Sequence, residues 1–151
     1  METVIQLNSQ AKLSEHFTLG EMTKSNSHPE VYNIPSHEAI ANLKRLCIWL
    51  EVLRERSGGP VRINSGYRSP QLNRAIHGNA NSNHMTGCAC DIKVSGMEQA
   101  LRYAVILLDY SQESHQEFDE LLIEKNRYGA IWVHFAVRPK ENRRKILFIN
   151  A

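Results

Sequence analysis

Two polar side chains occupy strand positions that face away from the apolar residues around them. In residues 88–94 the alternation leaves Asp91 opposite the apolar positions, and in residues 131–137 it does the same for His134. His84 lies in the polar loop that precedes Asp91. Two imidazoles and one carboxylate suit Zn²⁺ and leave a fourth tetrahedral position for water. These three residues therefore predict a catalytic Zn²⁺ site.

Such a site also needs a carboxylate outside the set of metal ligands. The metal lowers the pKa of a bound water towards about 7, and a neighbouring base must then carry a proton to the leaving amine. If the two strands that follow residue 118 form a hairpin, Glu124 lies on the same face as His134, at a diagonal distance of roughly 7–8 Å. We therefore expect Glu124 to be the general base, with Glu120 and Asp119 as weaker alternatives. A solvated strand charge is the competing interpretation of Glu124.

Four residues are expected to contact a substrate. Arg68 follows a short strand, and its planar guanidinium suits a carboxylate or a developing oxyanion, although a surface ion pair is the alternative. Tyr67 would pack against the substrate or donate its hydroxyl. Trp132 lies beside His134 and favours a cleft floor, and Ser82 would shape the loop through hydrogen bonds to the backbone.

The elements that must position these residues are helices early in the chain and strands late. Ser36 and Gly58-Gly59 delimit the clearest helix, Ser69-Pro70 opens a helix that ends at Gly78, and residues 97–110 form a third. Strands are expected at residues 61–64, 88–94, 119–124, 131–137 and 144–149. This order predicts an α+β fold with a small, mainly antiparallel sheet and helices packed on one side.

The sequence also makes predictions for segments outside these elements. Thr18–Glu21 has the form of a capping box and could open a short helix, and residues 1–13 are expected to be loosely ordered. The basic segment from Arg138 to Lys145 is interpreted as a solvated turn, with attraction to anionic cell-wall polymer as the alternative.

Composition narrows the class of protein. The chain has 151 residues, 42% of them hydrophobic, and a net charge of +2, which fits one domain spanning residues 1–151 and gives no support for nucleic-acid binding. Neither a signal peptide nor an apolar run of about 20 residues is seen. The three cysteines, Cys47, Cys88 and Cys90, imply no disulfide framework. We therefore expect a monomer made in the cytoplasm, without a membrane or nucleic-acid partner.

At the candidate ligands the sequence resembles a known family. The segment Ser82-Asn-His-Met-Thr-Gly-Cys-Ala-Cys-Asp91 resembles the Ser-x-His-x-x-Gly-x-Ala-x-Asp signature of the zinc D-alanyl-D-alanine carboxypeptidase family. Ser65-Gly-Tyr-Arg68 and Trp132-Val-His134 resemble two further segments of that family. The family includes phage endolysin peptidases and the D-Ala-D-Ala dipeptidases of vancomycin resistance. The matches run from about residue 17 to residue 137.

The resemblance implies a hedgehog and D-Ala-D-Ala peptidase-like fold, with Zn²⁺ at His84, Asp91 and His134 and with Arg68 engaging the substrate. It also implies peptidoglycan stem or cross-link peptides as substrates, cut by D-Ala-D-Ala carboxypeptidase or L-Ala-D-Glu endopeptidase action. An endolysin-like enzyme made without a signal peptide would reach the cell wall after lysis, through a holin or by another export route.

One position departs from the family pattern. Many relatives carry the catalytic acid three residues before the last histidine, where this chain has Ile131. Either Glu124 takes this role, or the chain is a catalytically inactive zinc-containing module that binds cell-wall peptides. A closed structural zinc site would need a fourth protein ligand, and strand alternation turns Cys88 and Cys90 towards the core.

Overall fold

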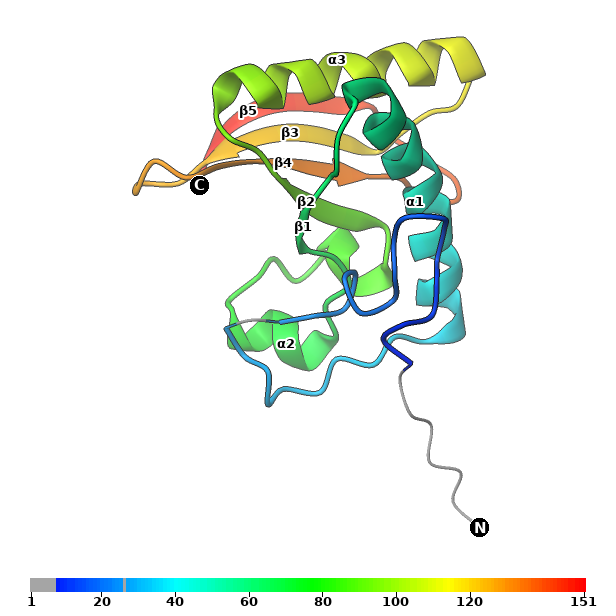
Figure 1. The fold of residues 1–151 in the computed structure, drawn as a ribbon. Helices are drawn as coiled ribbons and strands as arrows, with labels where there is room; N and C mark the ends of the chain where they lie inside the picture. The colour runs from blue at the N-terminus through cyan, green and yellow to red at the C-terminus, as the bar shows by residue number, and fades with distance from the viewer. Residues whose placement is uncertain (1–7, 26) are drawn as a thin grey trace.

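The computed structural model describes residues 8–25 and 27–151 and shows one open sheet with helices on both of its faces (Figure 1). The helices are α1 (His37–Ser57), α2 (Pro70–Ala75), the 3₁₀ helix η1 (Asn83–Thr86) and α3 (Met97–Ser114). The strands are β1 (Ile63–Ser65), β2 (Ala89–Lys93), β3 (Glu120–Lys125), β4 (Ile131–Ala136) and β5 (Lys145–Asn150). The predicted α+β class is confirmed.

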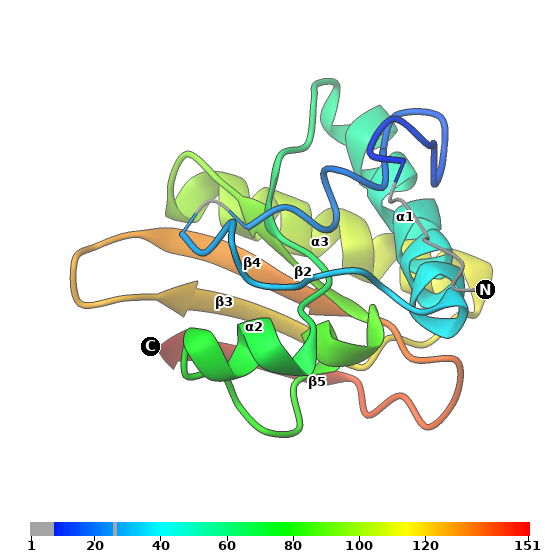
Figure 2. The same cartoon turned by 90° about the horizontal axis from the view of Figure 1, so that it is seen from below.

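The sheet has the strand order β1-β2-β4-β3-β5. The first three pairings are antiparallel, including the expected β3–β4 hairpin, and β5 pairs in parallel with β3 at the edge. α1 and α3 cover one face, whereas α2 lies on the opposite face, as the views from the side and from below both show (Figure 2). The mainly antiparallel sheet is therefore as expected, whereas the short helices α2 and η1 depart from the prediction that the helices pack on one side.

Helix α1 begins and ends where its capping residues predict. The Ser36 side chain accepts a hydrogen bond from the backbone N–H of Ala39, and Gly58 ends the helix in the left-handed conformation with φ 78°. The buried face of α1 repeats at three- and four-residue steps. Trp49 on this face packs against Phe135 on the sheet at a ring-centroid distance of 5.3 Å. The helix face and the apolar sheet face thus form one core.

Strand alternation divides the sheet into a core face and an open face. Ile92, Val133 and Phe135 are fully buried against the helices. Asp91 and His134 alternate with them and point to the other face. The same sequence pattern that builds the core therefore presents both side chains to the face that α2 and η1 partly cover.

Three local expectations differ from the structure. Thr18 and Glu21 form the hydrogen bonds of a capping box, but the chain makes only turns there. α2 ends at Ala75 and not at Gly78, because His77 takes a left-handed φ of 57°. α3 continues to Ser114 and ends at His115, which also has a positive φ.

The segment expected to be loosely ordered is held against the core in the part that the structure describes. Residues 1–7 lie outside the described residues. Lys12 forms a β-bridge with Thr18, and Ala11 and Leu13 pack against the core. Within residues 8–25 and 27–151, none of the helices is long and apolar enough to cross a membrane.

Gly87 and Gly58 allow a matched test of backbone geometry. Both have left-handed φ angles, but an added Cβ would collide with the Ala39 carbonyl oxygen only at Gly87, and would meet nothing within 4 Å at Gly58. We expect Gly58→Ala to lower the free energy of unfolding by about 1 kcal/mol, and Gly87→Ala by roughly 2 kcal/mol more. Urea unfolding of the two variants measures the difference. Equal losses would contradict the close approach of η1 to α1.

Candidate metal centre

Three elements bring His84, Asp91 and His134 together. Asp91 on β2 and His134 on β4 are direct partners across the sheet. His84 lies in η1, where the Ser82 hydroxyl accepts a hydrogen bond from the His84 backbone N–H. One ligand atom from each of the three residues lies within 4.8 Å of the other two. The structure thus brings together the three residues that the sequence predicted as ligands.

The tautomer of His84 is set by a backbone carbonyl. Its side chain is buried, and its Nδ1 lies 2.7 Å from the carbonyl oxygen of Gly66, so Nδ1 must carry the proton and donate it. Nε2 then faces Asp91 Oδ1 at 3.4 Å, and it has no hydrogen-bond partner among the described residues. A buried nitrogen that faces a carboxylate oxygen in this way is suited to a proton or a metal ion between them.

His134 has the same arrangement with its nitrogens exchanged. Its Nε2 lies 3.0 Å from Glu120 Oε1, and its Nδ1 lies 3.1 Å from Asp91 Oδ1. Burial lowers the pKa of His134, but hydrogen bonds and charge from Asp91 and Glu120 outweigh burial and raise the pKa to about 9. A proton on Nδ1 therefore fills the place that a metal ion would take, and the two compete for it.

Asp91 supplies the negative charge at the centre. Burial by itself would raise the pKa of this carboxyl, but the charges and hydrogen bonds of His84 and His134 hold the pKa well below its usual range. The carboxylate is thus ionised and ready to bind a cation. Two nitrogens and one carboxylate oxygen are a donor set that suits Zn²⁺. Cys90 is buried in the hydrophobic core, Cys88 is buried just before β2, and neither belongs to the group that could hold the ion.

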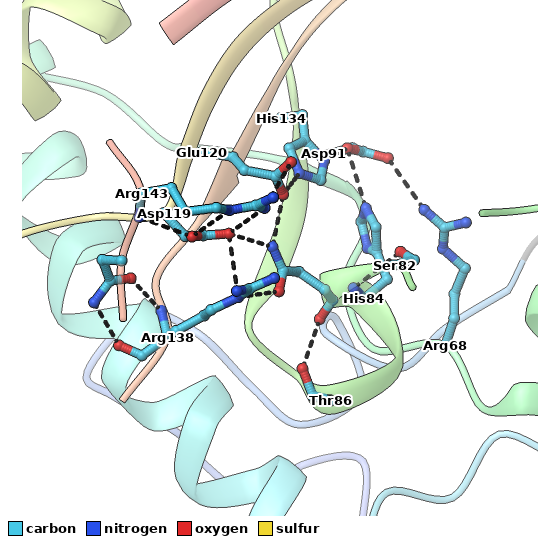
Figure 3. A network of polar contacts seen from close by, with 12 residues as sticks. Arg68, Ser82, His84, Thr86, Asp91, Asp119, Glu120, His134, Arg138 and Arg143 are labelled. Carbon is cyan, nitrogen blue, oxygen red and sulfur yellow. Dashed lines mark hydrogen bonds and ion pairs between the residues drawn. The ribbon is translucent and has the colours of Figure 1, made fainter. Parts of the chain in front are cut away.

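Glu120 and Asp119 are engaged as hydrogen-bond acceptors behind the ligands (Figure 3). Glu120 Oε1 accepts from His134 Nε2 and, at 2.7 Å, from Asn83 Nδ2. The hydrogen bond from His134 lowers the pKa of Glu120. Asp119 is fully buried and accepts from Asn83 and from Arg143. Glu120 therefore orients the His134 ring, as carboxylates commonly do for ligand histidines.

Glu124 is the third carboxylate of the three considered as a base. Leu122 pairs with His134 and Glu124 pairs with Trp132, so Glu124 lies diagonally from His134 on the same face, as the hairpin predicted. Burial raises the pKa of Glu124, and the charge of Asp91 adds to this rise while His134 opposes it. A carboxylate with a raised pKa is a better proton acceptor near neutral pH.

Arg68 lies beside the ligands and is tied to the η1 loop. Its Nη2 is 4.0 Å from Asp91 Oδ2, and its Nη1 donates to Asn73 Oδ1 at 3.3 Å. Its backbone N–H donates to the carbonyl oxygen of His84. The Arg68 side chain is 13% exposed, and its buried Nε has no hydrogen-bond partner in the described part of the chain. Its guanidinium therefore keeps donors for a bound group.

Two of the expected substrate contacts are not supported by the structure. Tyr67 is 7% exposed and joins the hydrophobic core, because the chain turns inward after β1. Trp132 lies on the face of the metal centre beside Glu124, but neither Trp132 nor Tyr67 lines the cleft. Arg68 and Ser82, the other two expected contacts, do line it.

The metal centre opens into a cleft of about 490 Å³ with a mainly polar wall. The sequence did not predict that the segment after β4 would form part of this wall. Arg138 and Arg143 form ion pairs with Asp119, and both line the cleft together with Lys145. The segment is exposed or half-exposed along its length, as expected of a solvated turn, but its ion pairs with the buried Asp119 hold it in place. The signal in the sequence that could have predicted the cleft position of Lys145 is the alternation of this charged residue with the apolar Ile146 at the start of β5.

A His–Asp–His group with a neighbouring carboxylate on an open α+β sheet defines a candidate metallohydrolase. Residues 15–127 match the family model described as Peptidase M15, and the chain belongs to this family of zinc D-Ala-D-Ala carboxypeptidase-type peptidases. The resemblance seen in the motifs is therefore confirmed. A search of curated proteins finds no match to the chain.

Zn²⁺ affinity should depend on pH through His134. Its pKa is about 9, so below that pH a proton must leave before the metal binds. We expect the affinity to rise by about tenfold per pH unit between pH 6 and pH 8, and to level off above the pKa. Competition with a chelator at each pH measures this slope. His37→Gln, on the exposed start of α1, is the control, and a slope near zero would contradict the arrangement.

Removal of Glu120 should weaken the metal site without removing a ligand. Glu120→Ala leaves His134 Nε2 without its acceptor, so we expect a loss of about 10- to 100-fold in Zn²⁺ affinity. Glu120→Gln keeps an acceptor oxygen and should lose less. Calorimetric titration with Zn²⁺ gives both values, with the exposed Glu117→Ala as the control. An unchanged affinity in Glu120→Ala would rule out the orienting role.

Proposed function

We propose that the chain is a zinc-dependent peptidase that hydrolyses an amide bond in peptidoglycan stem or cross-link peptides. The observation that carries this proposal is the convergence of His84 Nε2 and His134 Nδ1 on the Asp91 carboxylate, with Glu124 on the same face. Membership of the Peptidase M15 family supports the same reaction class. The mainly polar cleft suits an extended peptide rich in hydrogen-bonding groups.

The residues around the metal centre have separate roles in this reaction. A bound Zn²⁺ supplies Lewis acidity and lowers the pKa of water. Glu124 accepts the proton of the attacking water and donates it to the nitrogen of the leaving amine. Arg68 binds a carboxylate or the developing negative charge of the scissile carbonyl. Glu120 keeps the His134 ring in the orientation that leaves Nδ1 free for the metal.

The position of Glu124 favours catalysis over simple peptide binding. The family's acid position is occupied by Ile131, which packs against the core and has no proton to transfer. Glu124 reaches the same face from the neighbouring strand, and it is half-buried with a raised pKa. An inactive module that only binds peptides would have no need of a carboxylate with these properties at this position.

Glu124→Gln should abolish turnover and keep the metal. We expect a loss of about 10²–10⁴-fold in kcat with one equivalent of Zn²⁺ still bound, because the amide cannot accept a proton. The assay is a digest of purified muropeptides analysed by mass spectrometry, with the exposed Glu98→Gln as the control. The fragment masses also distinguish a D-Ala-D-Ala bond from an L-Ala-D-Glu bond. Binding without cleavage by the zinc-loaded wild type would favour the inactive module.

The raised pKa of Glu124 should also appear in the pH profile. The base works only when ionised, so kcat/KM of the wild type should fall as the pH drops through the pKa of Glu124, above the ordinary value of about 4.3 for a glutamate.

A further inference from the structure

Cationic side chains lie on both sides of the metal centre. Arg68 follows β1 at one edge of the sheet, whereas Arg143 and Lys145 lie at the start of β5, at the other edge. The strand ligands Asp91 and His134 are on β2 and β4, between these edges. Figure 3 shows Arg68 and Arg143 on opposite sides of the ligands. A peptide that crosses the centre towards β5 therefore meets a second positive region.

Arg143 is held in place from behind. Its Nε and Nη2 donate to the two oxygens of Asp119 at 3.0 and 2.8 Å, and its backbone N–H donates to Oδ1 as well. Asp119 is fully buried, while the Arg143 side chain is 49% exposed. The guanidinium is thus fixed with part of its surface open to the cleft. Because the guanidinium is already fixed, the Arg143 side chain loses less conformational entropy when an anion binds.

Lys145 adds a charge that no described residue neutralises. It pairs in register with Glu120, so it lies on the face of the metal centre, and it lines the cleft. Within residues 8–25 and 27–151 it makes no ion pair. Arg138, Arg143 and Lys145 outnumber Asp119 and Glu120 at this end of the cleft. One positive charge therefore remains for a ligand.

We propose that Arg143 and Lys145 form a subsite for a carboxylate of the substrate, on the side of the scissile amide that lies over β3 and β5. This inference rests on the proposed function and names its substrate class as a peptide with an acidic group on that side. β4 and β5 are two inter-strand spacings apart, roughly 10 Å. An extended peptide covers about 3.3–3.6 Å per residue. The acidic group thus belongs to a residue within about three positions of the scissile bond.

The subsite is a property of this chain beyond its family match. The matched region ends at residue 127, before Arg138, Arg143 and Lys145. Membership of the family therefore does not by itself supply these cations. Arg68 serves the opposite side of the centre, so the two positive regions select for different groups of one substrate.

The test uses a pair of synthetic stem peptides that differ only in whether the free carboxylate of the acidic residue is kept or converted to a carboxamide. Both are titrated by calorimetry into zinc-loaded Glu124→Gln protein. We expect about tenfold tighter binding of the carboxylate form, and a smaller ratio at high salt. Lys145→Gln in the same background should reduce the ratio to about threefold or less. Lys140→Gln removes the same charge from the same loop outside this cleft and should leave the ratio unchanged.

Each outcome separates this inference from the proposed function. Equal binding of the two peptides, or a ratio that Lys145→Gln leaves intact, overturns the subsite. A ratio that responds to Lys145→Gln, in a protein whose wild type cleaves neither peptide, supports the subsite and overturns the peptidase. Lys145 has no ion pair to lose within the described chain, so its substitution tests binding without disturbing the fold.

Discussion

Two histidine nitrogens that face one carboxylate oxygen form the constraint on which this site depends. His84 Nε2 and His134 Nδ1 both point at Asp91 Oδ1, within 3.4 Å. Each of these contacts is favourable only with a proton or a metal ion between the nitrogen and the oxygen. The outer nitrogens are fixed in turn, by the Gly66 carbonyl and by Glu120. The site is therefore prepared for a positive charge before any ligand binds.

The rigid parts of the fold keep these atoms in place. Asp91 and His134 share a strand pair whose other face is fully buried against the helices. η1 is tied to the chain after β1 through hydrogen bonds in both directions between the Gly66–Arg68 segment and His84. The packed core, which yields little to local strain, thus holds the two nitrogens and the carboxylate oxygen close together.

The strand-borne part of the site could be predicted because alternation is a local property. Asp91, His134 and Glu124 follow from the two-residue repeat and one short hairpin. Contacts made through loops did not follow. The inward turn that buries Tyr67, the buried position of Asp119 and the cleft position of Lys145 depend on β1 and β5 pairing with distant strands. Residue types alone do not encode such long-range register.

A single step along the backbone decides which side chain of β2 is the candidate metal ligand. Cys90 and Asp91 are neighbours with opposite directions, and the pairing of Cys90 with Phe135 keeps the sulfur in the core. A slip by one residue would offer a soft thiolate in place of a hard carboxylate, and thiolates favour closed tetrahedral centres without hydrolytic water. The register of β2 therefore decides whether a carboxylate or a thiolate faces the candidate metal centre, and it also decides which side chains pack in the core.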